Sequence, residues 1–144
     1  MALEITQYKP SDADFTRVGD RLSAVTIERG APAYDPLTVA FSAVADGRSA
    51  GDLIATLLWG RLTVNLLEVE KSERGKGIGS QLMSAAEDFA RAHGAVGVDL
   101  DTPTWQGEGF YETLGYSELG RMKLGTEGHF DGAPKFKILY HKEF

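Results

Sequence analysis

The chain has 144 residues, which is the size of one ordinary globular domain. Its 15 basic and 21 acidic residues give a net charge of −6, which disfavours a general nucleic-acid-binding protein because phosphate contacts need clustered lysine and arginine. The sequence contains no cysteine, which excludes disulfides, thiolate metal sites and cysteine nucleophiles. We therefore expect one cytoplasmic domain over residues 1–144, with no leader peptide, no membrane span and no nucleic-acid partner.

The first half of the sequence predicts a strand, a helix and an antiparallel meander. Leu3–Tyr8 fits a short strand, and a helix that begins near Ser11 carries apolar residues through Val25. Three further strands are expected over Leu37–Val44, Leu53–Trp59 and Leu62–Val69, with turns at Asp46-Gly47 and Gly60-Arg61.

The second half predicts a crossover between parallel strands. Ser80–His93 places its apolar residues on one helical face, and Gly94 is a helix stop. The strand after it, Ala95–Asp101, is reached through a helix and is expected to lie parallel to Leu62–Val69. A short helix over Glu108–Leu114 and strands over Tyr116–Met122 and Phe136–His141 complete the predicted elements. The fold class is therefore α/β, with a mixed sheet.

A glycine-rich segment lies between the third meander strand and the long helix. It reads Arg74-Gly75-Lys76-Gly77-Ile78-Gly79-Ser80, with glycine at every second position. Glycine lets a backbone turn tightly, and a loop that opens a helix directs free N–H groups at an anion. The segment fits a phosphate-binding loop or a turn with solvated charges, and its spacing matches neither the Walker nor the Rossmann motif.

Two motifs in this order resemble the GNAT superfamily of acyl-CoA-dependent N-acyltransferases. Arg74–Gly79 satisfies that family's [QR]-x-x-G-x-[GA] loop, and Phe110-Tyr111-Glu112-Thr113-Leu114-Gly115-Tyr116 is similar to its F-Y-E-K-L-G-F segment. The resemblance covers residues 50–122 best and is closest to small, single-domain bacterial acetyltransferases, some linked to antibiotic modification. It implies a GNAT-like fold in which the meander is followed by the crossover and the two central strands splay apart.

The resemblance also implies a set of cofactor contacts. The pyrophosphate of acetyl-CoA is expected on the glycine-rich loop, and the pantetheine arm on the backbone of the strand before it. The family's asparagine seven residues before its tyrosine is replaced by Thr104, and Gln106 is the nearby side chain that would compensate. The implied cofactor-binding residues are Leu67, Glu68, Val69, Arg74, Gly75, Lys76, Gly77, Ile78, Gly79, Ser80, Thr104, Gln106 and Tyr111.

Three residues are candidates for the chemistry. Tyr111 matches the family tyrosine that protonates or hydrogen-bonds the coenzyme sulfur, and its alternative role is packing in the core. Glu68 and Asp101 are the candidate general bases that remove a proton from the ammonium. Simple alternation puts Glu68 on the same face as Val64 and Leu66, pointing into the cleft or into solvent. Asp101 alternatively caps the following loop.

Other side chains carry weaker signals. Trp59 and Trp105 are candidates for the wall of the acceptor pocket or for simple packing. His93, His129 and His141 lack metal-ligand spacing, so we predict no metal.

The predicted function is acetyl transfer from acetyl-CoA to a primary amine of a small molecule by direct attack in a ternary complex. The alternatives are a protein or peptide N-acetyltransferase and a non-catalytic acyl-CoA-binding sensor. The loops Gly30–Pro36 and Gly125–Pro134 would decide the width of the acceptor site. By analogy with the family, we expect a homodimer.

Overall fold

The computed structural model describes residues 2–107, 109–125 and 134–144, and it divides the chain into two compact units, Met1–Asp35 and Pro36–Phe144. Glu108, His129 and most of the Gly125–Pro134 loop lie outside the described residues. Within the described part, no helix is long and apolar enough to cross a membrane. The single domain expected over 1–144 stays a prediction.

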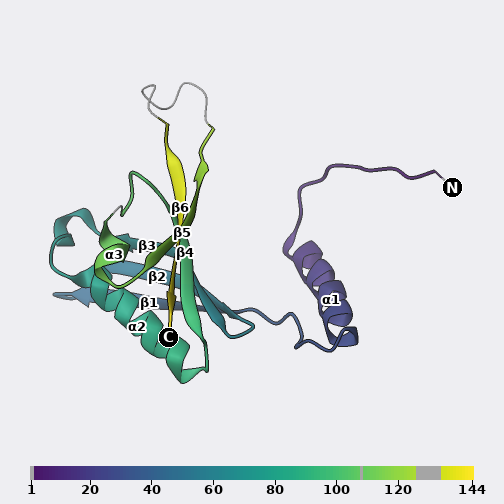
Figure 1. Ribbon diagram of the computed structural model, residues 1–144, viewed down its shortest axis with the longest axis horizontal. Helices are drawn as coiled ribbons and strands as arrows, with labels where there is room; N and C mark the ends of the chain where they lie inside the picture. Colours follow the sequence, from purple (N-terminus) through teal and green to yellow (C-terminus); the bar gives the residue numbers. More distant parts are fainter. Residues whose placement is uncertain (1, 108, 126–133) are drawn as a thin grey trace. The chain divides into compact units, whose positions relative to one another are not determined.

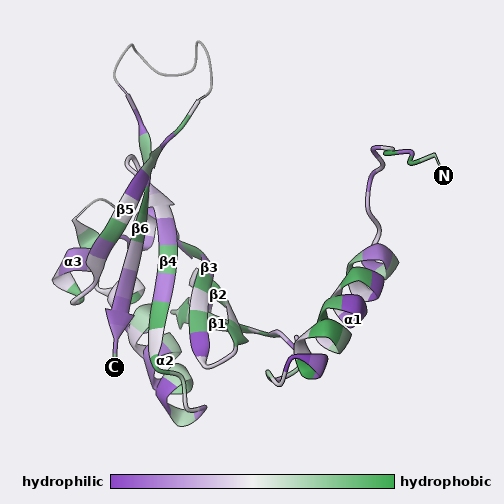
Figure 2. Ribbon diagram, turned by 45° about the vertical axis from the view of Figure 1, so that its right-hand side comes forward, coloured by the Kyte–Doolittle hydropathy of each residue, from purple (hydrophilic) through white to green (hydrophobic). Residues whose placement is uncertain are grey.

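The first unit contains one long helix, α1 (Asp12–Glu28), and the prediction of this helix is confirmed. Ser11 caps it, since its hydroxyl accepts a hydrogen bond from the Asp14 backbone while the Asp14 carboxylate accepts one from the Ser11 backbone. Figure 2 shows hydrophobic and hydrophilic bands along this helix. The strand predicted over Leu3–Tyr8 is wrong, since residues 2–10 form no strand. A strand needs a paired neighbour for its backbone groups, and an apolar pattern alone does not supply one.

The second unit is built on a mixed sheet, as expected. Its described strands are β1 (Leu37–Ala45), β2 (Arg48–Leu58), β3 (Arg61–Val69), β4 (Gly97–Pro103), β5 (Ser117–Lys123) and β6 (Phe136–Glu143), in the spatial order β1-β2-β3-β4-β6-β5. The β3–β4 pair is parallel and the other described pairs are antiparallel. The helical elements are η1 (Lys71–Glu73), α2 (Ile78–Ala92) and α3 (Phe110–Thr113). In the chain, α2 connects β3 to β4. Figure 1 shows that it lies along the sheet.

Two-residue turns close the meander. Asp46 and Gly47 have φ of 51° and 76°, and Trp59 and Gly60 have φ of 47° and 72°. Positive φ at both central residues matches the twist of a hairpin, which explains why each turn ends in glycine. The second turn lies one residue earlier than predicted, because Arg61 already pairs with Leu58.

The core of the second unit lies between the sheet and the two helices that pack on it. Alternate residues of β2, β3, β4 and β6 point into it, opposite one face of α2. The most deeply buried large side chains are Tyr140, Leu53, Leu62, Met83, Ile138 and Val98.

The sheet opens between β3 and β4. These strands pair only over Arg61–Val64 and Gly97–Leu100, whereas β4 stays paired with β6 as far as Pro103. The end of β3, residues 65–69, therefore has no strand partner on its β4 side among the described residues. This opening is the splay that the family resemblance implied.

An irregularity in β3 changes the face on which Glu68 lies. Ile54 pairs with Leu66 and Ala55 with Val64, so Asn65 is an extra residue in the ladder. Val64 is buried, while Leu66 and Glu68 are exposed. The prediction that Glu68 shares a face with Val64 is therefore wrong, because the bulge resets the alternation.

Candidate active site

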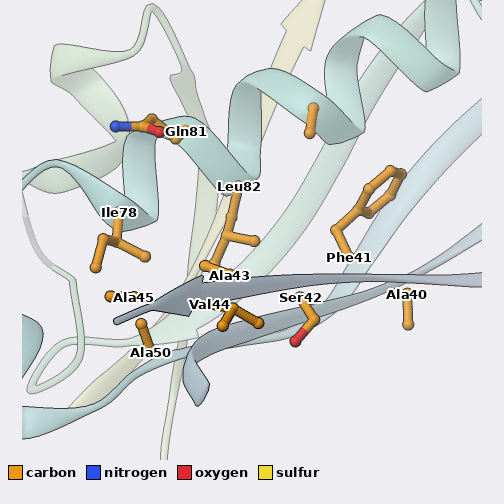
Figure 3. A pocket seen from close by; sticks show the side chains of 11 residues that line it. Ala40, Phe41, Ser42, Ala43, Val44, Ala45, Ala50, Ile78, Gln81 and Leu82 are labelled. Carbon is orange, nitrogen blue, oxygen red and sulfur yellow. The ribbon is translucent and has the colours of Figure 1, made fainter. Parts of the chain in front are cut away.

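Two hollows in the described part of the second unit differ in their chemistry, and one of them brings polar groups together. A hollow of about 550 Å³ between β1 and α2 is lined by eleven residues, none of them titratable. Figure 3 shows Leu82 pointing from the helix toward the strand and Phe41 on the helix side of the strand, with Ser42 and Val44 on the far side. This hollow offers apolar surface but no acid, base or anion-binding group.

The other hollow is a cleft of about 850 Å³ at the point where β3 and β4 separate. It collects residues from the end of β3, the glycine-rich turn, the start of α2, the segment after β4 and α3. The residues that line it are Leu66, Leu67, Glu68, Val69, Glu73, Arg74, Gly75, Gly77, Ile78, Gly79, Ser80, Thr102, Trp105, Gln106, Gly107, Phe110 and Tyr111.

The glycine-rich turn presents backbone rather than side chains to the cleft. Gly75 and Gly77 have φ of 79° and 80°, and a Cβ at either position would meet no atom within 4 Å. Gly77 is the N-cap of α2 and supplies no side-chain cap, so the first N–H groups of the helix are free for a ligand. A helix N-terminus of this kind favours an anion.

The two cations of the turn are engaged within it. Arg74 donates from Nε to the Val69 carbonyl at 3.0 Å, which ties the turn to the end of β3. Lys76 forms an ion pair with Glu73 at 2.8 Å and does not line the cleft. The helix start, rather than the Lys76 side chain, is therefore the anion-binding feature that faces the cleft.

Tyr111 also lines the cleft, and its ring lies within a group of aromatic rings. Its ring centroid is 5.0 Å from Phe110, 5.5 Å from Tyr140 and 5.9 Å from Tyr116. Burial raises the pKa of the Tyr111 hydroxyl above its ordinary value of 10, because the charged form loses solvation. The hydroxyl is therefore protonated at neutral pH and able to donate a proton.

The segment after β4 forms an ordered turn beside Tyr111. Thr104 continues the β4–β6 ladder, since its N–H donates to the Phe136 carbonyl at 2.9 Å. The Thr102 hydroxyl donates to the Gln106 carbonyl at 2.5 Å, and the Gln106 N–H donates to the Pro103 carbonyl at 2.9 Å. Trp105 and Gln106 line the cleft as a result.

Most of the sequence-predicted site residues meet in this cleft. Glu68 and Tyr111 both line it, together with all the predicted backbone positions of β3 and the turn except Lys76. Thr104 and Asp101 do not line it; Asp101 is an exposed residue of β4, opposite Leu139 of β6. Trp105 lines the cleft, whereas Trp59 is in the β2–β3 turn.

Sequence reasoning missed five lining residues: Leu66, Glu73, Thr102, Gly107 and Phe110. The aromatic-rich segment around Tyr111 was a signal for Phe110. No sequence pattern marked Thr102, because its role depends on a carbonyl four residues later.

A mixed sheet that opens beside a glycine-rich helix start defines the N-acetyltransferase fold class. The family model of the acetyltransferase (GNAT) domain matches residues 37–118, more than half of the chain, and the chain belongs to this family. The family prediction and the fold-class prediction are confirmed.

Two curated relatives match part of the chain. Blasticidin-S acetyltransferase of Streptomyces morookaense is 41% identical over 71 residues, which is 49% of this chain and 52% of that protein. Streptothricin acetyltransferase of Streptomyces lavendulae is 40% identical over 89 residues, 60% of this chain and 47% of that protein. The chain therefore spans about half the length of these relatives.

Solved structures share the fold over the whole chain. A protein from Agrobacterium tumefaciens superposes with a TM-score of 0.77 at 26% identity and covers 100% of both chains. An acetyltransferase from Bacillus cereus has a TM-score of 0.73 at 21% identity, covering 97% of this chain and 98% of its own.

Proposed function

We propose that this chain transfers an acetyl group from acetyl-CoA to a primary amine of a small molecule. One observation carries the proposal: the free helix start of α2, the unpaired end of β3 and Tyr111 line a single cleft. These three features are an anion site, a row of backbone hydrogen-bonding groups and a proton donor. Membership of the acetyltransferase family supports the same function.

The residues that line the cleft fit acetyl-CoA in their chemistry and in the room that they leave. The backbone N–H groups of Gly75–Ser80 would hold the pyrophosphate, because a Cβ at Gly75 or Gly77 would strain the turn that directs them. The β4-facing edge of Leu67–Val69 offers the amide and carbonyl groups that a pantetheine arm requires. When bound, acetyl-CoA supplies a thioester whose carbonyl carbon accepts an amine nitrogen and whose sulfur leaves.

Two side chains then move protons. Glu68, an exposed carboxylate on the lip of the cleft, takes a proton from the acceptor ammonium and leaves the neutral, nucleophilic amine. Tyr111 donates its hydroxyl proton to the departing sulfur. The attacking nitrogen releases its second proton to solvent as the amide forms, and Tyr111 regains a proton from solvent. Holding both reactants in one orientation supplies much of the acceleration. Asp101, outside the cleft lining, is the second candidate base.

The acceptor is proposed from the relatives' names. Blasticidin-S and streptothricin acetyltransferases are named for small molecules, so these two compounds are the first acceptors to assay. We also propose a homodimer, by analogy with the family, which size-exclusion chromatography with light scattering tests directly.

The experiment is the shift in thermal unfolding midpoint with acetyl-CoA, CoA and ATP, in the intact chain and in Gly77→Glu. We expect both CoA species to stabilise the intact chain, by about 2.7 kcal/mol at a ligand concentration one hundred times the dissociation constant. Gly77→Glu should abolish the shift, because it adds strain and negative charge at the anion site.

Gly94→Glu is the matched control. Gly94 also has positive φ and open space around it, but it lies beyond the opposite end of α2. This variant should lose a similar amount of stability and keep the response to CoA. No response of the intact chain to either CoA species would overturn the proposed function. Binding without thiol release on any amine would support a sensor.

A further inference from the structure

We propose that Thr102 is a positioning residue that fixes the turn beside Tyr111, and so holds the thioester end of the cleft in its working shape. This inference rests on the proposed function. Tyrosines aside, the buried polar or charged side chains among the described residues are Glu87 and Thr102, with exposed fractions of 8% and 5%. Glu87 forms an ion pair with Lys142 at 2.6 Å, outside the cleft lining, whereas Thr102 lines the cleft itself.

The hydroxyl of Thr102 closes the turn that follows β4. The Thr102 hydroxyl donates to the Gln106 carbonyl at 2.5 Å, and the Gln106 N–H donates to the Pro103 carbonyl at 2.9 Å. Both backbone groups of Gln106 are therefore bound within one short segment, on the strand that leads into the cleft. Gln106 therefore has little freedom to move without breaking one of these hydrogen bonds, of which the one from Thr102 is partly buried.

The position of this turn determines the position of Tyr111, because Gly107 contacts both Tyr111 and Phe110. Gly107 follows Gln106 with φ of +80°, and a Cβ built on it would lie 3.3 Å from Cε2 of Tyr111, so its backbone packs closely against that ring. The Gly107 carbonyl also accepts a hydrogen bond from the Phe110 N–H at 3.1 Å, at the first residue of α3. A displaced turn would therefore shift both the neighbour of the Tyr111 ring and the start of its helix.

Packing alone does not account for a threonine here. Valine has nearly the same shape and buries no hydroxyl, and a buried hydroxyl costs free energy unless it is hydrogen-bonded. The hydrogen bond to the Gln106 carbonyl is the interaction that threonine makes and valine could not make at this position. The geometry thus assigns the Thr102 hydroxyl to the shape of the turn.

The experiment compares Thr102→Val with Thr102→Ser and with the intact chain. Calorimetry gives dissociation constants for acetyl-CoA, which spans the cleft, and for 3′-phosphoadenosine 5′-diphosphate, which has no pantetheine arm. We expect Thr102→Val to bind acetyl-CoA about tenfold more weakly, a change of about 1.4 kcal/mol. It should bind the diphosphate as the intact chain does, and Thr102→Ser, which keeps the hydroxyl, should restore acetyl-CoA binding.

The outcomes separate this inference from the proposed function. Thr102→Val binding both ligands like the intact chain would overturn the inference, and so would an equal loss for both, which indicates general damage. If Thr102→Ser does not restore acetyl-CoA binding, the loss in Thr102→Val comes from altered packing, and this result would also overturn the inference. If the intact chain binds neither ligand, the proposed function fails first, and that result is seen without any variant.

Discussion

At the scale of single residues, Tyr111 is held against the sheet through Tyr140. Its ring packs against Tyr140 of β6, and Tyr140 in turn donates from its hydroxyl to the Glu112 carboxylate at 2.6 Å. That hydrogen bond lowers the pKa of Glu112 and, together with burial, raises the pKa of Tyr140 to about 12. The four-residue helix α3 is thus attached to the sheet at Tyr111 and at Glu112, and its own hydrogen bonds would not be enough to hold so short a helix.

The ion pair between Arg61 and Glu143 predicts how stability changes in acid. Arg61 binds the Glu143 carboxylate at 2.8 Å and, with His141, lowers its pKa from 4.5 to about 2. The unfolded chain therefore binds more protons than the folded chain in this window. The stabilisation is complete above about pH 4.5 and is lost as the pH falls toward 2. Glu143→Gln should flatten the fall of the unfolding midpoint over this range.

Circular dichroism melts between pH 2 and pH 6 measure this slope. Glu70→Gln is the control, because the structure describes no ion pair for Glu70, and it should keep the slope of the intact chain. A Glu143→Gln slope equal to that of the intact chain would rule out this ion pair as a source of the acid sensitivity.

At the scale of elements, the shape of β3 decides the shape of the cleft. Gly51 of β2 allows β3 to come close, because a Cβ there would lie 2.7 Å from the Glu68 carbonyl oxygen and 3.2 Å from the Val69 Cα. Both atoms are backbone and neither is able to move alone. The glycine therefore fixes the distance between β2 and the part of β3 that lines the cleft.

Gly51→Ala tests this role. We expect it to lower the free energy of unfolding by about 1–3 kcal/mol, as overpacking does, and to weaken acetyl-CoA binding because Glu68 and Val69 are displaced. Gly120→Ala in β5, where a Cβ would meet nothing within 4 Å, should change stability by less than about 0.5 kcal/mol. Urea titration and calorimetry give the two quantities, and equal stability of the two variants would contradict the role assigned to Gly51.

Some features of these elements were predictable from the sequence and others were not. The glycine-rich turn and the segment Phe110–Tyr116 were predicted because their residues act locally, through backbone conformation and a short helix. The bulge at Asn65 was not, since alternation of apolar residues cannot reveal one extra residue in a strand. The Thr102 hydrogen bond was missed because it depends on where a later turn places a carbonyl. The strand over Leu3–Tyr8 failed because pattern alone supplies no pairing partner.

At the scale of the whole molecule, the core and the cleft belong to one of the two units. The clustered core residues lie within 39–140 and the cleft residues within 66–111, all in the unit Pro36–Phe144. An apolar core of its own is what allows a segment to fold alone.

The fragment 36–144 therefore tests the prediction of a single domain over 1–144. We expect the fragment to unfold in one cooperative transition and to bind acetyl-CoA with the affinity of the full chain. Differential scanning calorimetry and isothermal titration measure both properties. A fragment that stays unfolded would instead support one domain that includes residues 1–35.

The early separation of β3 from β4 has a further consequence for how the protein behaves in storage. Residues 65–69 leave a row of backbone donors and acceptors open in the middle of the sheet rather than at its rim. An open strand edge is a template on which another polypeptide strand can pair, and such pairing leads to aggregation. Under the proposed function, a pantetheine arm in that gap would occupy the same groups. Acetyl-CoA would then protect the protein from aggregation, and protein purified without acetyl-CoA would be the form most prone to precipitate.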